Sequence, residues 1–164
     1  MKKILLASLI AVSSQFALAD NAPQVDPAFA KIETLVKAKN FNEAYKELDR
    51  LAQTGNAQAI YDLGFLTQAG QGTTKHDAKA LELFKQSANR KSFGERAAFK
   101  LGEFYEYGEI PVNRDFKESL HWYEIAAKTN KEAQLIVANM YYQGIGTEKN
   151  YEKAVRLYLN IRKI

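Results

Sequence analysis

The sequence predicts an all-helical fold, an α-solenoid of about four helix-turn-helix repeats. Similar segments recur at regular intervals, and each carries a glycine where its first helix must end. The recurrence is read from Ala59, Ala97 and Ala133, which start three equivalent stretches 38 and then 36 residues apart. No stretch of useful length alternates apolar and polar residues as a half-buried strand does, so we expect no sheet.

The N-terminus has the pattern of a secretory signal peptide. Lys2 and Lys3 give a positive start, residues 4–12 are apolar, and Ala17 and Ala19 form the small-x-small site that precedes cleavage. The apolar run is too short for a membrane anchor, which usually needs about 20 apolar residues. We therefore expect a periplasmic protein with three parts. These are a cleaved signal peptide at 1–19, a short linker at 20–25 and a repeat domain at 26–164.

Composition excludes several classes of protein. The chain has no cysteine, so disulfides and thiolate chemistry are absent and packing must stabilise the fold. Its hydrophobic content of 46% is ordinary for a globular chain. The formal charge of +4 is spread among mixed acidic and basic residues rather than gathered in a phosphate-binding stripe. We expect no nucleic-acid partner.

The first helix of each repeat is marked by three small residues. An alanine is followed five positions later by a very small residue and six positions after that by a glycine. These positions are Ala59, Gly64 and Gly70, then Ala97, Gly102 and Gly108, then Ala133, Ala138 and Gly144. Small side chains allow two helices to approach closely, and glycine adopts the left-handed conformation that ends a helix.

The second helix of each repeat begins at a capping residue and carries a small residue and then an aromatic four positions later. The small and aromatic residues are Ala80 and Phe84, Ser119 and Tyr123, and Ala154 and Tyr158. Asp115 and Asn150 are the expected caps, and Asn40 begins a similar but degenerate unit. His76 stands where a cap is expected, so a helix-start role is favoured over metal ligation.

The repeats predict four pairs of helices. First helices are expected at 27–39, 57–69, 95–107 and 131–143, and second helices at 41–53, 77–89, 115–128 and 150–162. The corresponding units are a degenerate repeat at 26–55 and repeats at 56–90, 95–130 and 131–164.

Two segments of the third unit resemble a known family. Residues 101–108 read Leu-Gly-Glu-Phe-Tyr-Glu-Tyr-Gly, and residues 120–127 read Leu-His-Trp-Tyr-Glu-Ile-Ala-Ala. They are similar to the two halves of the Sel1-like repeat, a relative of the tetratricopeptide repeat. Ile110 and Pro111 depart from the pattern, replacing its second loop glycine and lengthening that loop by one residue. The resemblance implies a right-handed superhelix whose first helices line a concave, protein-binding surface.

By analogy with tetratricopeptide helices, the partner-binding groove is expected to carry half-exposed side chains of three first helices. The candidates are Tyr61, Phe65, Phe99, Glu103, Leu135, Asn139 and Tyr142. A second candidate surface is the C-terminal end, where Tyr158 and Ile161 would dock the partner or a second copy. The alternative is that the stems of Arg156, Arg162 and Lys163 cover this end.

No pattern indicates catalysis, a metal site or a cofactor. His121 is expected on the surface between Glu118 and Glu124, and neither histidine belongs to a spaced ligand set. The glycine pairs at 70–72 and 144–146 follow helices, so they are interpreted as helix ends rather than phosphate loops. The glutamates at 103, 106 and 109 are expected to form a solvated acidic face, with partner binding as the alternative.

The sequence therefore favours a non-enzymatic periplasmic scaffold that binds a protein partner, as a monomer or weak dimer without a cofactor. One alternative is an immunity protein that neutralises a toxic effector acting in the periplasm, such as a secreted lipase. A cell-envelope enzyme is a second alternative that no group of residues supports.

Overall fold

A computed structural model describes residues 27–91, 93–109 and 111–161, and these form eight helices and no strand. The expected signal peptide, the linker and residues 162–164 lie outside the described residues. The helices are α2 (Pro27–Lys37), α3 (Phe41–Gln53), α4 (Ala57–Ala69), α5 (Asp77–Ala88), α6 (Gly94–Tyr107), α7 (Phe116–Ala126), α8 (Lys131–Gln143) and α9 (Tyr151–Ile161).

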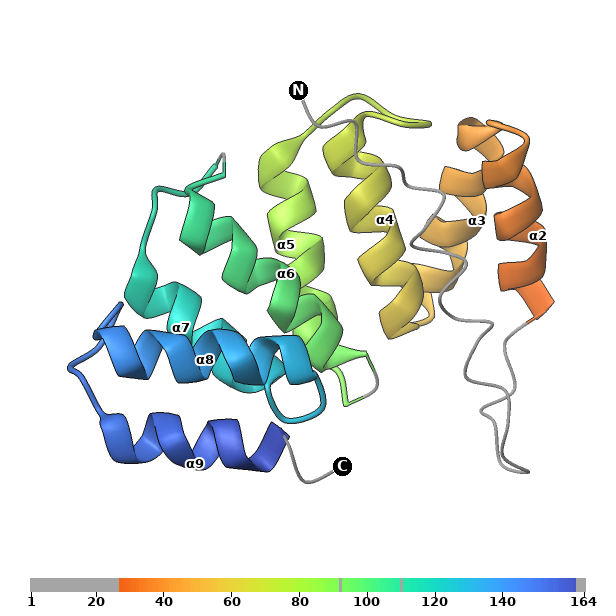
Figure 1. Cartoon of the computed structure of the whole chain (residues 1–164). Coiled ribbons are helices and arrows are strands. Elements are labelled where there is room, and N and C mark those ends of the chain that lie inside the picture. The colour runs from red at the N-terminus through yellow and green to blue at the C-terminus, as the bar shows by residue number, and fades with distance from the viewer. Residues whose placement is uncertain (1–26, 92, 110, 162–164) are drawn as a thin grey trace, which may run out of the picture.

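The helices form an α-solenoid in which each helix packs against the next along the chain. Figure 1 shows the array from α2 at the N-terminal end to α9 at the other. The helices of the first two pairs stand upright in this view, whereas α8 and α9 lie nearly horizontal, so the helix direction turns along the array. The predicted fold class is confirmed, and all eight helices lie at the expected places.

The expected glycines end the first helices. Gly70, Gly108 and Gly144 are C-caps in the left-handed conformation, with φ of 66°, 65° and 74°. α2 ends earlier than predicted, at Lys37, because the chain turns at Lys39, which takes a positive φ of 59°.

Of the residues expected before the second helices, Asp115 and Asn150 cap the helix with their side chains, whereas Asn40 does not. The Asp115 carboxylate accepts hydrogen bonds from the backbone N–H groups of Lys117 and Glu118, at 2.9 and 3.1 Å. Asn150 accepts a hydrogen bond from the N–H of Lys153 at 2.9 Å. Asn40 is the N-cap of α3, and its carbonyl oxygen accepts a hydrogen bond from the N–H of Ala44 at 3.1 Å, but its side chain makes no capping hydrogen bond. Its backbone, at φ −82° and ψ 66°, lies outside the extended region in which caps usually aim their side chains.

Small residues bring the two helices of each repeat together. A Cβ added at Gly102 would lie 2.6 Å from the Tyr123 ring, and one added at Gly64 would lie 2.9 Å from the ring of Phe84. Both distances are closer than real contacts, so each aromatic ring fills the space that a glycine leaves. The equivalent position in the last repeat, Ala138, is fully buried and accommodates a methyl group.

Two loops reach back to the preceding repeat. A Cβ added at Gly72 would lie 2.1 Å from the carbonyl oxygen of Phe41, the first residue of α3. A Cβ at Gly146 would lie 2.1 Å from the carbonyl oxygen of Phe116, the first residue of α7. Only glycine permits backbone-to-backbone approach this close. The loop at 108–115 is one residue longer than those at 70–76 and 144–150, as predicted.

The hydrophobic core runs along the array as successive clusters, each shared by neighbouring helices. Trp122 on α7 packs against two of these clusters and is half-buried, which places it between repeats. Its indole N–H is buried and has no hydrogen-bond partner among the described residues.

Candidate functional site

First helices of neighbouring repeats enclose a surface pocket of about 440 Å³. Its lining comes from α4, from α6 and from the residue that caps α8. We call it the α4–α6 pocket. It is lined by Tyr61, Phe65, Arg96, Phe99, Lys100, Glu103 and Asn130.

The repeat brings these side chains to one side of the array. Tyr61 and Phe99 occupy the same position in successive repeats, and so do Phe65 and Glu103. Within each helix the two residues are four apart and therefore share a face. Asn130 reaches the pocket as the N-cap of α8, where its side-chain oxygen accepts a hydrogen bond from the N–H of Ala133 at 3.0 Å.

Aromatic rings form the apolar part of the pocket. The ring of Tyr61 meets Phe65 edge-on at a centroid distance of 4.9 Å, and Phe65 meets the buried Phe84 at 5.0 Å. Phe99 packs in the same manner on Tyr123 at 5.4 Å. These edge-to-face contacts hold the rings in place, so the apolar wall is formed in advance of any binding.

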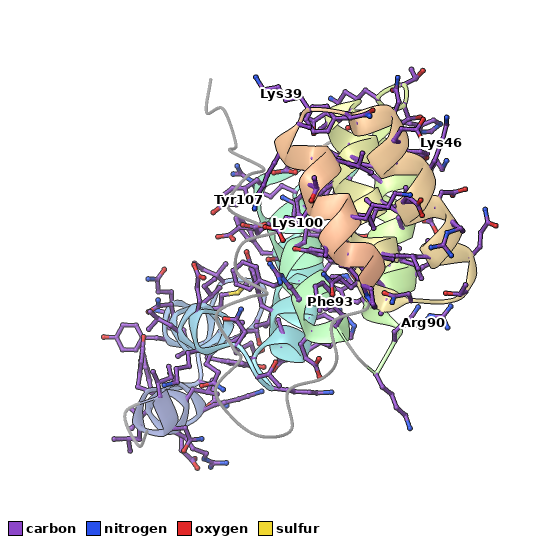
Figure 2. All side chains as sticks on the ribbon, turned by 90° about the vertical axis from the view of Figure 1, so that its right-hand side faces the viewer. Lys39, Lys46, Arg90, Phe93, Lys100 and Tyr107 are labelled. Carbon is purple, nitrogen blue, oxygen red and sulfur yellow. The ribbon has the colours of Figure 1, made fainter. Side chains whose placement is uncertain are left out.

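Arg96 and Lys100 add positive charge beside the rings. The Arg96 guanidinium lies over Tyr61 at 5.6 Å and over Phe93 at 5.1 Å. The Lys100 ammonium lies 5.1 Å from the Phe104 ring, although Lys100 itself is largely buried. Figure 2 shows Lys100 and Tyr107 along α6, with Phe93 just before the first residue of this helix.

Carboxylates neutralise much of this charge. The Lys100 ammonium lies 3.2 Å from Glu103 and 3.8 Å from Glu109. The Gln68 amide donates to the same Glu109 carboxylate at 3.2 Å. Burial raises the pKa of Glu103 against the opposing effect of Lys100. The pocket thus presents an apolar wall with paired charges at its edge.

Asp62 lies on α4 beside the pocket, near Arg96. Burial raises the pKa of Asp62 to about 7, although Arg96 and a hydrogen bond from Gln58 lower it. Burial also raises the pKa of Tyr61 to about 12, with Arg96 acting in the opposite direction. Arg96 therefore interacts electrostatically with two groups of the neighbouring repeat.

The structure brings four of the seven predicted groove residues together in the pocket and places the other three elsewhere. Tyr61 is buried rather than half-exposed, with 5% of its surface exposed, because the rings of Phe84 and Phe93 cover it. Leu135, Asn139 and Tyr142 lie on α8, exposed to solvent and outside the pocket lining. Tyr142 stacks edge-on against Tyr151 of α9 at 5.4 Å. Asn139 accepts a hydrogen bond from the hydroxyl of Tyr158, also on α9.

Tyr158 and Ile161, the residues expected at the C-terminal end, are both half-buried on α9. Tyr158 packs at the edge of the last core cluster.

Sequence reasoning missed Arg96, Lys100 and Asn130. It followed the aromatic residues, whereas the spacing of 96, 100 and 103 around Phe99 already places these side chains on one side of α6. Asn130 contributes only because α8 begins next to α6, and nothing in its local sequence indicates that position.

The contacts of the two histidines are with neighbouring residues of the helices α5 and α7. The Nδ1 atom of His76 accepts a hydrogen bond from the N–H of Lys79 at 3.2 Å, which makes His76 the N-cap of α5. The exposed His121 ring lies edge-on to Trp122 at 5.3 Å. Within the described ranges, no group of three or more histidine or acidic residues could hold a metal ion. No helix in the same ranges is long and apolar enough to cross a membrane.

The Sel1 repeat model matches three segments, residues 57–92, 95–129 and 131–159. The chain belongs to the Sel1-repeat family. Repeats of this family typically act as scaffolds for protein–protein interaction and are generally non-catalytic. The matches leave out α2 and α3, which form the degenerate first unit.

Two solved structures share this Sel1-repeat fold. One is c5321, a protective antigen of uropathogenic Escherichia coli, with 29% identity and a TM-score of 0.63. The match covers 71% of this chain but only 25% of c5321. The other is a Sel1 repeat protein from Oxalobacter formigenes, also with 29% identity and a TM-score of 0.63, of which 86% is covered. Comparison with curated proteins gave no match.

Proposed function

We propose that this Sel1-repeat protein is a periplasmic, non-enzymatic scaffold that holds a protein partner at the α4–α6 pocket. The observation that carries the proposal is the preformed wall of Tyr61, Phe65 and Phe99 beside paired charges. Rigid aromatic side chains at the centre of an interface contribute much of the binding energy between proteins. The paired charges at the edge favour a partner that places an apolar side chain in the pocket and polar groups around it.

The periplasmic part of the proposal rests on residues 1–19. Cell fractionation and N-terminal sequencing of the exported protein test it directly. We expect the periplasmic form to begin at Asp20. A cytoplasmic protein that retains Lys2 and Lys3 would contradict export.

Site-specific photo-cross-linking in living cells tests the binding site. A benzophenone amino acid at Phe99 should capture a distinct partner protein. The same group at Lys46, an exposed residue of the second helix α3, serves as the matched control. Equal capture at both positions would contradict the proposed site.

The purified partner then allows affinity to be measured. We expect Phe99→Ala to weaken binding by about tenfold or more, since anchors of this kind cost above about 1.4 kcal/mol when truncated. Lys46→Ala should leave affinity unchanged. The identity of the partner separates the two functions considered from the sequence. A secreted lipase or another toxin inhibited by the protein would establish an immunity role, and an envelope protein would establish an adaptor role.

A further inference from the structure

Exposed apolar side chains gather on the last two helices. Seven large hydrophobic residues of the described chain are exposed, and five of them lie on α8 and α9. The five are Leu135, Tyr142, Tyr151, Val155 and Leu159. We call this set the α8–α9 face. Exposed apolar side chains gathered on neighbouring helices mark interaction sites in soluble proteins.

The position of Val155 is buried in the inner repeats. Leu81 and Leu120 each expose 6% of their surface, whereas Val155, at the same repeat position, exposes 53%. The first helix of the following repeat makes the difference. It places Leu101 against Leu81, and Val137 against Leu120, in shared core clusters. Among the described residues no helix follows α9, so Val155 keeps an apolar side chain at a core position that no described helix covers.

The exposed residues of α9 form a regular stripe. Tyr151, Val155 and Leu159 are spaced by four residues, so they follow one another along one side of the helix. A neighbouring side of α9 packs on α8 through Ala154, which is fully buried, and through Leu157. α9 is therefore apolar on two sides, and only one of them is covered.

Contacts between the helices hold the face in shape. The ring of Tyr142 supports Tyr151 at 5.4 Å, and the Tyr158 hydroxyl donates to Asn139 at 2.6 Å. Both contacts join α8 to α9. Figure 2 shows these two helices end-on at the edge of the molecule, apart from α2 and α3. A partner would meet a surface that loses little conformational freedom on binding.

The other end of the array, formed by α2 and α3, has no apolar surface against which the α8–α9 face could pack. None of the exposed large hydrophobic residues lies on α2 or α3. The exposed positions of α2 carry Ala30, Lys31, Thr34 and Lys37 after Pro27, a mostly polar set. Head-to-tail stacking would therefore bury apolar side chains against lysines. The matching surface is the α8–α9 face of another molecule, and contact between identical surfaces produces a two-fold dimer.

We propose that the α8–α9 face is a homodimer interface in which α9 packs antiparallel against α9 of a second copy. Val155 lies near the two-fold axis, and Tyr151 of each molecule faces Leu159 of the other. Glu152 and Arg156, which form an exposed ion pair at 2.7 Å within α9, lie beside the stripe. An antiparallel crossing brings each Glu152 toward the Arg156 of the other copy, so opposite charges meet at the edge.

The interface is small, so the dimer is weak. An 11-residue helix is about 16 Å long, and stable interfaces usually bury more than about 1,000 Å² in total. Leu135 and Tyr142 of α8 widen the contact beyond α9. Dimerisation should therefore depend on protein concentration.

Sedimentation velocity over a dilution series from micromolar to millimolar tests the dimer, using the protein from Asp20 to Ile164. We expect a concentration-dependent monomer–dimer equilibrium. Val155→Glu should raise the dissociation constant by about tenfold or more, because it buries a charge at the axis. Tyr107→Glu is the matched control, since Tyr107 is an equally exposed apolar residue on α6, and should leave the equilibrium unchanged. Thermal melting checks that both variants stay folded.

Cysteine cross-linking tests the antiparallel arrangement, because the natural chain has no cysteine. A mixture of Tyr151→Cys and Leu159→Cys should oxidise to a linked dimer more completely than either variant alone. A protein that stays monomeric at every concentration overturns the proposal, and so does a dimer indifferent to Val155→Glu. More complete linkage of Tyr151→Cys with itself overturns the antiparallel packing. Loss of partner capture in a monomeric Val155→Glu variant assigns the face to the partner instead.

Discussion

The hydroxyl of Tyr158 donates a hydrogen bond to the side-chain oxygen of Asn139 at 2.6 Å, joining α9 to α8. The same two positions in the second repeat are Phe84 and Phe65, whose rings meet at 5.0 Å. The fourth unit thus has a polar contact between its two helices where the second unit has an aromatic one. Asn139, expected in the groove, and Tyr158, expected at the C-terminal end, therefore belong to one surface.

Substitution of Gly102 by alanine should destabilise the protein by about 1–3 kcal/mol, the usual cost of overfilling a core. The added methyl would lie 2.6 Å from the Tyr123 ring, which is itself buried. Helix propensity alone predicts the opposite sign, because alanine is better than glycine inside a helix by about 1 kcal/mol. Denaturant unfolding gives the sign directly.

Ala138→Gly is the control for Gly102→Ala. The same repeat position already holds a methyl group there, so its loss should cost only the helix-propensity difference and a small cavity. A Gly102→Ala variant more stable than the natural protein would show that Tyr123 can move aside.

The contribution of Asp62 to the stability of the protein should decrease as the pH rises. Burial raises the pKa of Asp62 to about 7 in the folded protein, against about 3.9 for an unperturbed aspartate. The folded state then binds the proton more tightly, so this contribution favours folding at low pH and is lost as the pH rises through the folded pKa. The stability of Asp62→Asn relative to the natural protein should increase between about pH 5 and about pH 8. A constant difference across that range would contradict this assignment.

Glu124 should show the opposite pH dependence. Burial raises its pKa, but hydrogen bonds from Lys153 at 2.9 Å and Tyr141 at 2.8 Å outweigh burial and lower it overall. A lowered pKa gives stability that is present above the unfolded value and lost as the pH falls through the folded value. Glu124→Gln should therefore lower the melting temperature near neutrality and much less in acid. An equal loss at both pH values would show that the ionised carboxylate is not what stabilises this contact.

Trp122 should report on the junction between repeats, because it is the only tryptophan in the chain. It is half-buried between two core clusters, so its fluorescence should be moderately blue-shifted and should move to the red on unfolding. We expect Trp122→Ala to cost about 2–3 kcal/mol, below most fully buried cases. His121→Ala is the control, since that exposed ring touches the indole without lying in the core. An emission spectrum already typical of exposed tryptophan would contradict the placement.

Local chemistry explains why the sequence predicted the helices well. Gly70, Gly108 and Gly144 end helices through their own backbone conformation, and Asp115 caps α7 with its own side chain. Such effects are complete within a few residues. Asn40 is the exception, because the tight turn at Lys39 sets its backbone differently.

The site was harder to predict because neighbouring repeats determine exposure. Tyr61 and Leu135 share one repeat position, yet the first exposes 5% of its surface and the second 46%. Tyr61 is covered by Phe84 and Phe93 of the following elements, whereas Leu135 has no following repeat among the described residues. The pattern within one repeat predicts on which face of its helix a residue lies. It does not predict which neighbouring residues cover that face.

The glycine loops have a consequence for how such arrays change length. Gly72 and Gly146 each fasten their repeat to the one before it through a backbone contact that involves no particular side chain of the earlier helix. A duplicate of the second or the fourth unit would carry its own glycine contact to the unit before it, whereas the third unit has no glycine at this place. Genes can therefore lengthen the array by either of these two units without redesigning its joints.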